Sequence, residues 1–356
     1  MNSIYKSLLR PLLFKLDAEH AHNIACKILS VTEHSNLSRK FIQLCSSSSS
    51  SGLNLFGLNF RNQIGLAAGM DKNGQFPKSF SALGFGHVEI GTVTPKPQTG
   101  NPMPRLFRYP SYNAIINRMG FNNDGVEEIV KRIKNIYPKE KRLSPLGINI
   151  GKGKDTSIKN AIDDYIFCLN KSFNQADYIT VNISSPNTPN LRELHKSSLI
   201  SPLLKSLSLE NKACAKRNNS EPIPLLLKIS PDENFKTLEF IISRAVENEF
   251  SGVIATNTSV NRFQNKDLEL FESGGLSGKP IEKRSNEIIR FIAKLTDFKF
   301  PIIGVGGISS VNSVVEKLDA GAVLLQLYTS LIYQGPFQPS NLIKGMARRT
   351  NKWTFS

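Results

Sequence analysis

The chain has 356 residues, 40% of them hydrophobic, which is enough for one large barrel domain with a small appendage or for two ordinary domains, and which excludes global disorder. Lysine and arginine number 45 against 29 acidic residues, and the formal net charge of +16 suits nucleic acid, an anionic membrane surface or anionic small ligands. The basic residues are scattered and only one tryptophan is available for stacking, so we expect no nucleic-acid partner.

The four cysteines, Cys26, Cys45, Cys168 and Cys214, are widely spaced and form no CxxC pair. This spacing argues against a zinc site and a disulfide framework and suits a reducing compartment, so we expect no metal. No apolar stretch reaches the roughly 18 residues that a membrane span requires. The N-terminus lacks the apolar core and cleavage site of a secretory signal, so we expect the chain to stay on the cytoplasmic side.

Residues 1–45 are predicted to form a helical extension. Its first apolar face comprises Tyr5, Leu8, Leu9, Leu12 and Leu16. A second helix is expected to begin at Asp17, a suitable N-cap residue. These apolar faces either pack on the main domain, which the pattern alone favours, or form an amphipathic hairpin in the membrane interface with basic residues facing the lipid headgroups.

A run of six serines closed by Gly52 predicts a flexible linker over residues 46–52. From residue 53 to 356 the chain repeats one unit, in which a short apolar strand precedes a longer helical pattern. The candidate strands are 64–67, 87–92, 146–150, 178–182, 225–229, 252–256, 302–306 and 323–327, and the helical patterns between them include 126–136, 158–173, 235–248 and 281–295. Eight such units predict an α/β fold of the (β/α)8 TIM barrel type, with a doubly wound open sheet as the alternative. Residues 105–118 are expected to form an inserted loop or hairpin over the barrel mouth.

Barrel enzymes place their chemistry at the C-terminal ends of the strands. In this sequence polar side chains mark those ends, among them Lys72, Thr92, Asn149, Asn182, Lys228, Thr256, Asn257, Thr258 and Thr329. A lone lysine there is usually a solvated rim charge, but a ring of Lys, Asn and Thr indicates a binding site, because each member takes the place of an apolar residue. Asparagines 117, 149, 182, 187 and 257 offer donors and acceptors that suit a planar, amide-rich substrate bearing a carboxylate.

Glycine loops follow the last strands of the predicted barrel. Gly306 and Gly307 follow the seventh strand, and residues 274–278 are expected to lie on the loop after the sixth. Exposed backbone N–H groups at this place commonly bind phosphate, which indicates a phosphorylated cofactor whose ring reaches the centre of the mouth. Lys228 could neutralise negative charge that develops on that ring. None of the five histidines ends a strand, so a Ser-His-Asp hydrolase is poorly supported, and Ser185 by itself is typical of a turn serine.

The same segments resemble those of the dihydroorotate dehydrogenase family. The matching segments are residues 65–74, 89–95, 117–122, 147–152, 182–188, 274–278 and 304–308, and they follow the family's order and spacing. The resemblance implies a non-covalently bound FMN and the oxidation of dihydroorotate to orotate in pyrimidine synthesis. Ser185 matches the catalytic base, a position that the soluble branch of the family fills with cysteine.

The resemblance also implies the binding residues. FMN would contact Ala68, Gly69, Met70, Asp71, Lys72, Thr92, Asn149, Asn182, Lys228, Thr256, Gly278, Gly307, Tyr328 and Thr329. Substrate would contact Lys72, Asn117, Arg118, Met119, Gly120, Phe121, Asn182, Asn187, Asn257 and Thr258. One departure is Thr329, which stands where the family usually has serine.

The serine at position 185 and the N-terminal helices resemble the quinone-reducing, membrane-associated branch of the family. This branch implies a quinone tunnel near His22, Arg108 and Tyr328, and a peripheral location on an anionic cell membrane surface. It therefore favours the interfacial arrangement of residues 1–45. Two other classes stay open: a flavin barrel that reduces uridine in tRNA, which would need an added RNA-binding domain, and a non-redox phosphate-binding barrel such as an aldolase or isomerase.

Overall fold

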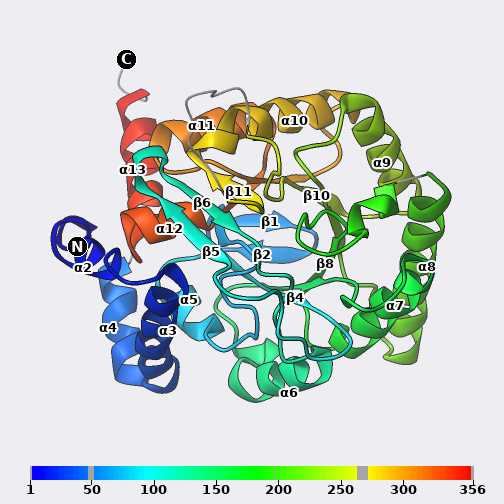
Figure 1. Cartoon of the computed structure of the whole chain (residues 1–356), viewed down its shortest axis with the longest axis horizontal. Helices are drawn as coiled ribbons and strands as arrows, with labels where there is room; N and C mark the ends of the chain where they lie inside the picture. The colour runs from blue at the N-terminus through cyan, green and yellow to red at the C-terminus, as the bar shows by residue number, and fades with distance from the viewer. Residues whose placement is uncertain (1, 47–51, 196, 263–271, 354–356) are drawn as a thin grey trace.

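Eight parallel strands close into a barrel at the centre of the computed structural model, which describes residues 2–46, 52–195, 197–262 and 272–353 (Figure 1). Around the barrel the strand order is β10-β12-β13-β3-β4-β7-β8-β9. The strands are β3 (Ile64–Leu66), β4 (His87–Val93), β7 (Leu146–Ile150), β8 (Tyr178–Asn182), β9 (Leu225–Lys228), β10 (Gly252–Ala255), β12 (Ile302–Val305) and β13 (Leu324–Leu327). The predicted (β/α)8 barrel is confirmed and the open sheet is excluded.

A ring of helices surrounds the barrel (Figure 1). They are α5 (Pro77–Ala82), α6 (Val126–Ile136), α7 (Ala161–Ser172), α8 (Ser197–Arg217), α9 (Phe235–Glu247), α10 (Glu282–Leu295), α11 (Val311–Asp319), α12 (Thr329–Gln334) and α13 (Gln338–Trp353). In α6 the residues Val126, Ile129 and Ile133 recur at helical spacing and are fully buried. Their burial against the strands stabilises the helix far more than local propensity does.

A three-stranded antiparallel sheet lies over the mouth of the barrel. It comprises β5 (Leu106–Tyr109), β6 (Ala114–Asn117) and β11 (Gly275–Gly278), and Figure 1 shows it crossing in front of the barrel strands. The predicted hairpin at 105–118 is therefore confirmed. Residues 274–278 lie in the connection after the sixth barrel strand, as predicted, but residues 275–278 form a strand there instead of a loop. The segment Gly-Leu-Ser-Gly has little strand propensity of its own, and its pairing with β6, with Gly275 opposite Asn117, makes it a strand.

A short hairpin closes the opposite end of the barrel. Its strands are β1 (Leu53–Leu55) and β2 (Leu58–Phe60), and the fully buried Phe60 packs among residues near the starts of the barrel strands, including Tyr178 and Leu226. The chemistry of the barrel is thereby confined to the mouth.

The N-terminal extension contains one more helix than predicted. Helical turns over Asn2–Ile4, Tyr5–Leu9 and α2 (Arg10–Leu13) lead into α3 (Ala18–His34), which α4 (Asn36–Ser46) follows. The predicted N-cap is confirmed, because the Asp17 carboxylate accepts from the backbone N–H groups of Glu19 and His20 at 2.9 and 3.0 Å. Ser46, expected to begin the linker, instead ends α4 and is buried; residues 47–51 lie outside the described residues.

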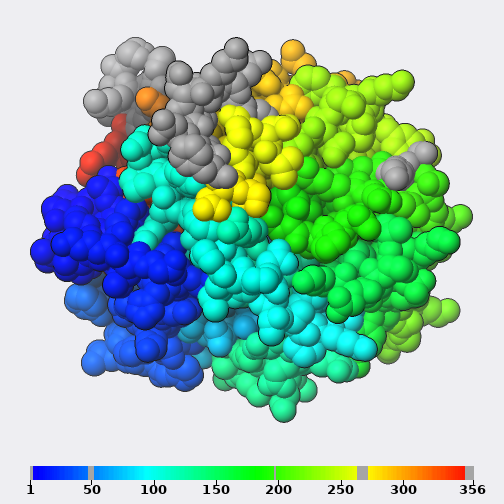
Figure 2. Space-filling view, in the orientation of Figure 1, coloured from blue at the N-terminus to red at the C-terminus, as the bar shows by residue number. Residues whose placement is uncertain are grey.

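Polar contacts fasten the extension to the barrel. Glu19 of α3 forms an ion pair of 2.8 Å with Arg105, beside the mouth sheet. Ser46 donates to the carbonyl of Ala82 at 2.6 Å. Figure 2 shows residues of the extension, in blue, forming a continuous surface with the cyan mouth segment. Among the described residues, no helix combines the length and apolar character that crossing a membrane requires.

Candidate functional site

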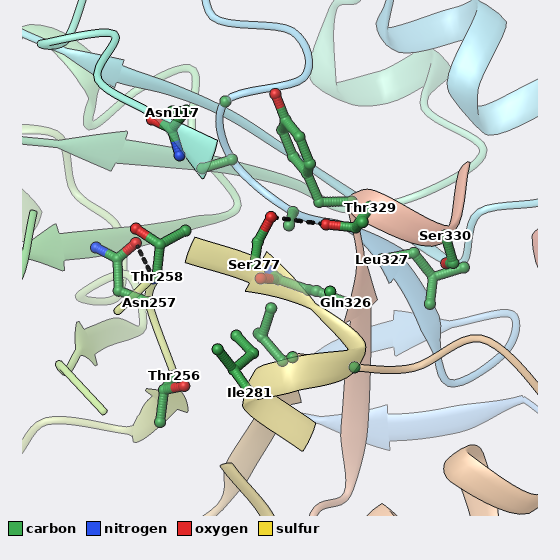
Figure 3. A pocket seen from close by; sticks show the side chains of 18 of the residues that line it. Asn117, Thr256, Asn257, Thr258, Ser277, Ile281, Gln326, Leu327, Thr329 and Ser330 are labelled. Carbon is green, nitrogen blue, oxygen red and sulfur yellow. Dashed lines mark hydrogen bonds between the residues drawn. The ribbon is translucent and has the colours of Figure 1, made fainter. Parts of the chain in front are cut away.

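A pocket opens at the C-terminal ends of the barrel strands, beneath the mouth sheet (Figure 3). Its lining includes these predicted residues: Ala68, Gly69, Lys72, Thr92, Asn117, Met119, Gly120, Phe121, Asn182, Ser185, Asn187, Lys228, Thr256, Asn257, Thr258, Gly278, Gly307, Tyr328 and Thr329. The barrel thus gathers into one cavity side chains that lie up to 261 positions apart, from Ala68 to Thr329. In Figure 3, Asn257 and Thr258 lie on one side of the cavity, with Ser277 and Thr329 on the other.

Six predicted residues do not line this pocket: His22, Met70, Asp71, Arg108, Arg118 and Asn149. Met70 packs in the hydrophobic core, and Asp71 accepts from the backbone N–H groups of Gln75 and Phe76 at 2.8 Å each. Burial raises the pKa of Asp71 to about 6. Met70 and Asp71 therefore support the backbone of the loop that carries Lys72, without facing the pocket.

The two arginines are engaged elsewhere. Arg118 pairs with Glu272 at 2.7 Å on the rim. Arg108 donates to the backbone carbonyls of Leu13 and Leu16, and its guanidinium lies 4.5 Å from the ring centroid of Phe14. Arg108 thus joins the mouth sheet to the N-terminal extension.

A chain of amide hydrogen bonds forms one wall of the pocket. Asn182 donates to Thr92 Oγ1 at 3.0 Å and to Asn149 Oδ1 at 3.2 Å, and Thr92 donates to Asn149 Oδ1 at 2.5 Å. Asn257 in turn donates to Asn182 Oδ1 at 3.3 Å. Asn149 is fully buried and reaches the cavity only through these neighbours.

Two lysines face the cavity from opposite parts of the barrel. Lys72 donates to the carbonyl of Gly69 at 2.9 Å, and burial lowers its pKa to about 8, while the carboxylate of Glu19 opposes the shift. Lys228 ends β9 and is buried; burial lowers its pKa and the carboxylate of Glu89 opposes that shift. The pocket therefore holds two ammonium groups that an anionic ligand would stabilise.

Ser185 lies in the loop after β8 and is buried at the pocket wall. Its hydroxyl accepts from the N–H of Asn187 at 3.3 Å, and Asn187 donates to the side-chain oxygen of Asn117 at 3.1 Å. The hydroxyl of Thr188, in the same loop, is buried and has no hydrogen-bond partner among the described residues. The loop thus carries a buried, unpaired hydroxyl three residues after Ser185.

The far end of the pocket has the features of a phosphate cradle. Gly278 and Gly307 have φ of 97° and 77°, and a Cβ on either would approach Asn113 O at 2.2 Å or Glu282 Cβ at 2.3 Å, so only glycine fits. Ser277 and Thr329 are hydrogen-bonded at 2.8 Å (Figure 3). The hydroxyl of Ser330, next to Thr329, is buried without a partner among the described residues. An unpaired donor beside glycine backbone fits a phosphorylated ligand.

Some residues that line the pocket were not predicted as site residues, notably Ser277, Gln326 and Ser330. Gln326 carried a signal, because it is a polar residue within the apolar strand 323–327. Glu89, inside the strand His87–Val93, carried the same signal and lies at the barrel centre below the pocket. Ser277 and Ser330 are ordinary in sequence and enter the site only through the fold.

A parallel (β/α)8 barrel with a polar, cationic pocket at its C-terminal mouth has the architecture of a barrel enzyme. The family model for dihydroorotate dehydrogenase matches residues 51–349. The dihydroorotate dehydrogenase (quinone) of Idiomarina loihiensis is 47% identical over 330 residues, covering 93% of this chain and 96% of its own length. That of Chromobacterium violaceum is 47% identical over 347 residues and covers 97% of both chains. The chain belongs to the dihydroorotate dehydrogenase family.

Solved structures agree with this assignment. The crystal structure of DHODH from Eimeria tenella in complex with ferulenol has a TM-score of 0.79 and 32% identity, over 90% of this chain and 92% of that one. A ligand-free structure of the same organism's DHODH has a TM-score of 0.78 and 33% identity.

Proposed function

We propose that this protein oxidises dihydroorotate to orotate with FMN as first electron acceptor and a membrane quinone as the final one, in pyrimidine biosynthesis. The observation that carries the proposal is the convergence of Ser185, Lys72 and Lys228 on one cavity that also contains a phosphate cradle. Membership of the family supports it further.

The cavity supplies groups for each part of FMN. Backbone at Gly278 and Gly307, with the hydroxyls of Thr329 and Ser330, would hold the phosphate. The remaining flavin contacts would be Ala68, Gly69, Thr92, Asn182, Lys228, Thr256 and Tyr328, with Met70, Asp71 and Asn149 supporting them from behind. Lys228 would stabilise negative charge on the reduced ring because it is already held in the barrel, away from bulk water. FMN, when bound, supplies the hydride acceptor and passes the electron pair to the quinone.

The substrate would lie against the asparagines and Lys72. The ammonium of Lys72 is suited to the carboxylate, and Asn117, Asn187 and Asn257 to the ring amides. The rest of this wall would comprise Asn182, Thr258, Met119, Gly120 and Phe121. Arg118 directly precedes Met119 and would hold this backbone segment in place from the rim, where it pairs with Glu272. Ser185 Oγ would take the proton from the carbon beside the substrate carbonyl while the neighbouring carbon gives up hydride, so that the double bond of orotate forms between them. The unpaired hydroxyl of Thr188 is a suitable first stop for that proton.

Quinone would approach between the extension and the barrel, near His22, Arg108 and Tyr328. Tyr328 lines the pocket, and Arg108 contacts the backbone of the extension. His22 of α3 is half-buried, and burial lowers its pKa to about 4, with a smaller contribution from the positive charge of Lys72. These contacts support a route from the N-terminal helices to the flavin.

The same helices would place the enzyme on the cytoplasmic surface of an anionic cell membrane. In α4 the side chains of Leu37, Phe41 and Leu44 share one helical face and are 81%, 66% and 76% exposed. Lys6, Arg10, Lys15, Lys27 and Lys40 lie in the same extension. An exposed apolar face combined with basic residues is typical of interfacial helices.

The test is an anaerobic titration of the purified protein with dihydroorotate. Bound FMN should absorb at about 450 nm, and this absorbance should fall in proportion to added dihydroorotate. It should return when a quinone is added. A colourless preparation that cannot take up FMN would contradict the proposal and favour a non-redox barrel. Bound flavin that dihydroorotate leaves oxidised would point to a different oxidoreductase.

A further inference from the structure

A carboxylate lies at the centre of the barrel, below the pocket. Glu89 projects from β4 and is fully buried. Its Oε1 accepts from Asn149 Nδ2 at 2.9 Å, and its Oε2 accepts from Gln326 Nε2 at 2.8 Å and Thr180 Oγ1 at 3.1 Å. A longer contact of 3.4 Å runs from the hydroxyl of Tyr178. These donors come from β7, β8 and β13, so one side chain joins four of the eight barrel strands.

The contacts around Glu89 are those of a carboxylate that accepts hydrogen bonds on both oxygens. A buried carboxylate requires donors, and both amide neighbours present N–H groups to it. Its negative charge raises the pKa of Tyr178 in concert with burial, and it opposes the effect of burial on the pKa of Lys228. The carboxylate of Glu89 therefore acts electrostatically on the ammonium of Lys228 inside the barrel.

The carboxylate of Glu89 also sets the orientation of the amides above it. Because a carboxylate only accepts, Asn149 must turn its nitrogen downward and present Oδ1 to Thr92 and Asn182. Gln326 must likewise turn its nitrogen to Glu89, which leaves its Oε1 buried and unpaired among the described residues, at the pocket lining. An N–H group of a bound ligand could donate a hydrogen bond to this oxygen.

We propose that Glu89 is a positioning residue that orients Asn149 and Gln326 and tunes the reduction potential of the flavin through its negative charge. The inference rests on the proposed function, because it requires FMN in the pocket. Glu89 opposes Lys228 electrostatically: the ammonium favours added negative charge on the ring, and the carboxylate moderates that effect. Removing the carboxylate charge while keeping its shape should therefore stabilise the reduced flavin.

The experiment measures the reduction potential of FMN bound to wild-type protein, Glu89→Gln, Glu89→Asp and Thr180→Val. In Glu89→Gln the equilibrium should shift at least tenfold toward the reduced form, which is about 30 mV for a two-electron couple. Glu89→Asp retains the charge, and Thr180→Val removes one donor without altering the charge, so both should shift the equilibrium less than threefold. An equal shift in all three variants, or none in Glu89→Gln, would overturn the inference.

Folding provides a second measurement. If Glu89→Gln accumulates only as insoluble protein, the double variant Glu89→Gln/Lys228→Met should recover soluble, folded chain, because it removes both members of the charge pair. Failure of that recovery would contradict the pairing of Glu89 with Lys228. Failure of the proposed function would look different, since the wild-type protein itself would then hold no FMN.

Discussion

The carboxylate of Glu33 accepts hydrogen bonds from both the backbone N–H and the hydroxyl of Ser79, each at 2.8 Å. It also accepts from the N–H of Lys78 at 3.2 Å. Glu33 belongs to α3 and Ser79 to the first turn of α5, so a side chain of the N-terminal extension caps a helix of the barrel. Glu33 is only 2% exposed, so water is largely excluded from the contact, and burial raises the pKa of its carboxyl group. The extension is thus anchored on one side, while α4 exposes apolar side chains on the other.

Replacing Glu33 by alanine should loosen this anchor. Two buried N–H groups would lose their acceptor, at a cost of about 1–3 kcal/mol in the free energy of unfolding. Hydrogen exchange of the backbone amides should accelerate in α3 and α5 and stay unchanged in α9. Glu33→Gln keeps one acceptor oxygen but faces the other N–H donor with its own NH2 group, so its effect should be smaller than that of alanine. Equal exchange in wild-type and alanine variants would show that other contacts hold the extension.

Ser185→Ala should abolish the proton transfer and leave FMN in place. The rate of flavin reduction by dihydroorotate should fall by about 10²–10⁴-fold, the usual contribution of a general base. Stopped-flow absorbance under anaerobic conditions measures this step directly. Ser309→Ala, which changes another serine of the pocket lining, two residues after Gly307, is the matched control and should reduce the rate far less. Reduction of the Ser185→Ala flavin at the wild-type rate would remove Ser185 from its proposed role.

Orotate binding should weaken at alkaline pH. Burial lowers the pKa of Lys72 to about 8, so above this pH the protonated fraction, and with it the attraction for the ligand carboxylate, falls. The dissociation constant should therefore rise toward about tenfold for each pH unit above that value, and level off below it. Spectral titration with orotate across this range measures the effect. Lys72→Arg stays charged and should show a flat profile; an equally steep rise in that variant would assign the titration to another group.

The exposed face of α4 should bind membranes. Changing Leu37, Phe41 and Leu44 together to glutamate removes apolar area worth about 1.5–3 kcal/mol per fully buried side chain and adds charge that anionic lipid repels. Flotation with vesicles containing phosphatidylglycerol should fall at least tenfold, and turnover with a long-chain quinone should fall with it. Flavin reduction by dihydroorotate should not change. Leu209→Glu, at a 58% exposed leucine of α8, is the control. Undiminished flotation of the triple variant would place the membrane contact elsewhere.

Lys317 should make stability depend on pH. It is fully buried in α11, where it donates to Ser285 and Asn286, and burial lowers its pKa to about 7. The unfolded chain binds this proton more tightly, so the folded state should gain stability as pH rises from about 7 toward 10. Lys317→Met should raise the free energy of unfolding by about 1–4 kcal/mol below that range and lose the advantage above it. Urea unfolding at both ends of the range measures this, and a difference that is constant with pH would rule out Lys317 as the titrating group.

The strands, the barrel and most of the pocket lining were predictable from local patterns. Each barrel strand lies within one residue of its predicted bounds, because a fully buried parallel strand is a continuous apolar run flanked by polar turns. The N-cap at Asp17 was predictable for a similar reason, since its carboxylate bonds to N–H groups only a few residues away. In these cases the residues that stabilise the element lie within the segment itself.

Tertiary structure alone decided the rest. The segment 275–278 is a strand only because β6 lies beside it, and Ser46 is helical and buried because Ala82 and Ser340 bond to it. The role of Glu89 likewise depends on donors contributed by three other strands. Local pattern determines which element a segment can form, since propensity and periodicity act over a few residues. Which polar groups meet in the low-dielectric centre of the barrel depends on its closure, which brings together side chains more than 200 positions apart, such as Glu89 and Gln326.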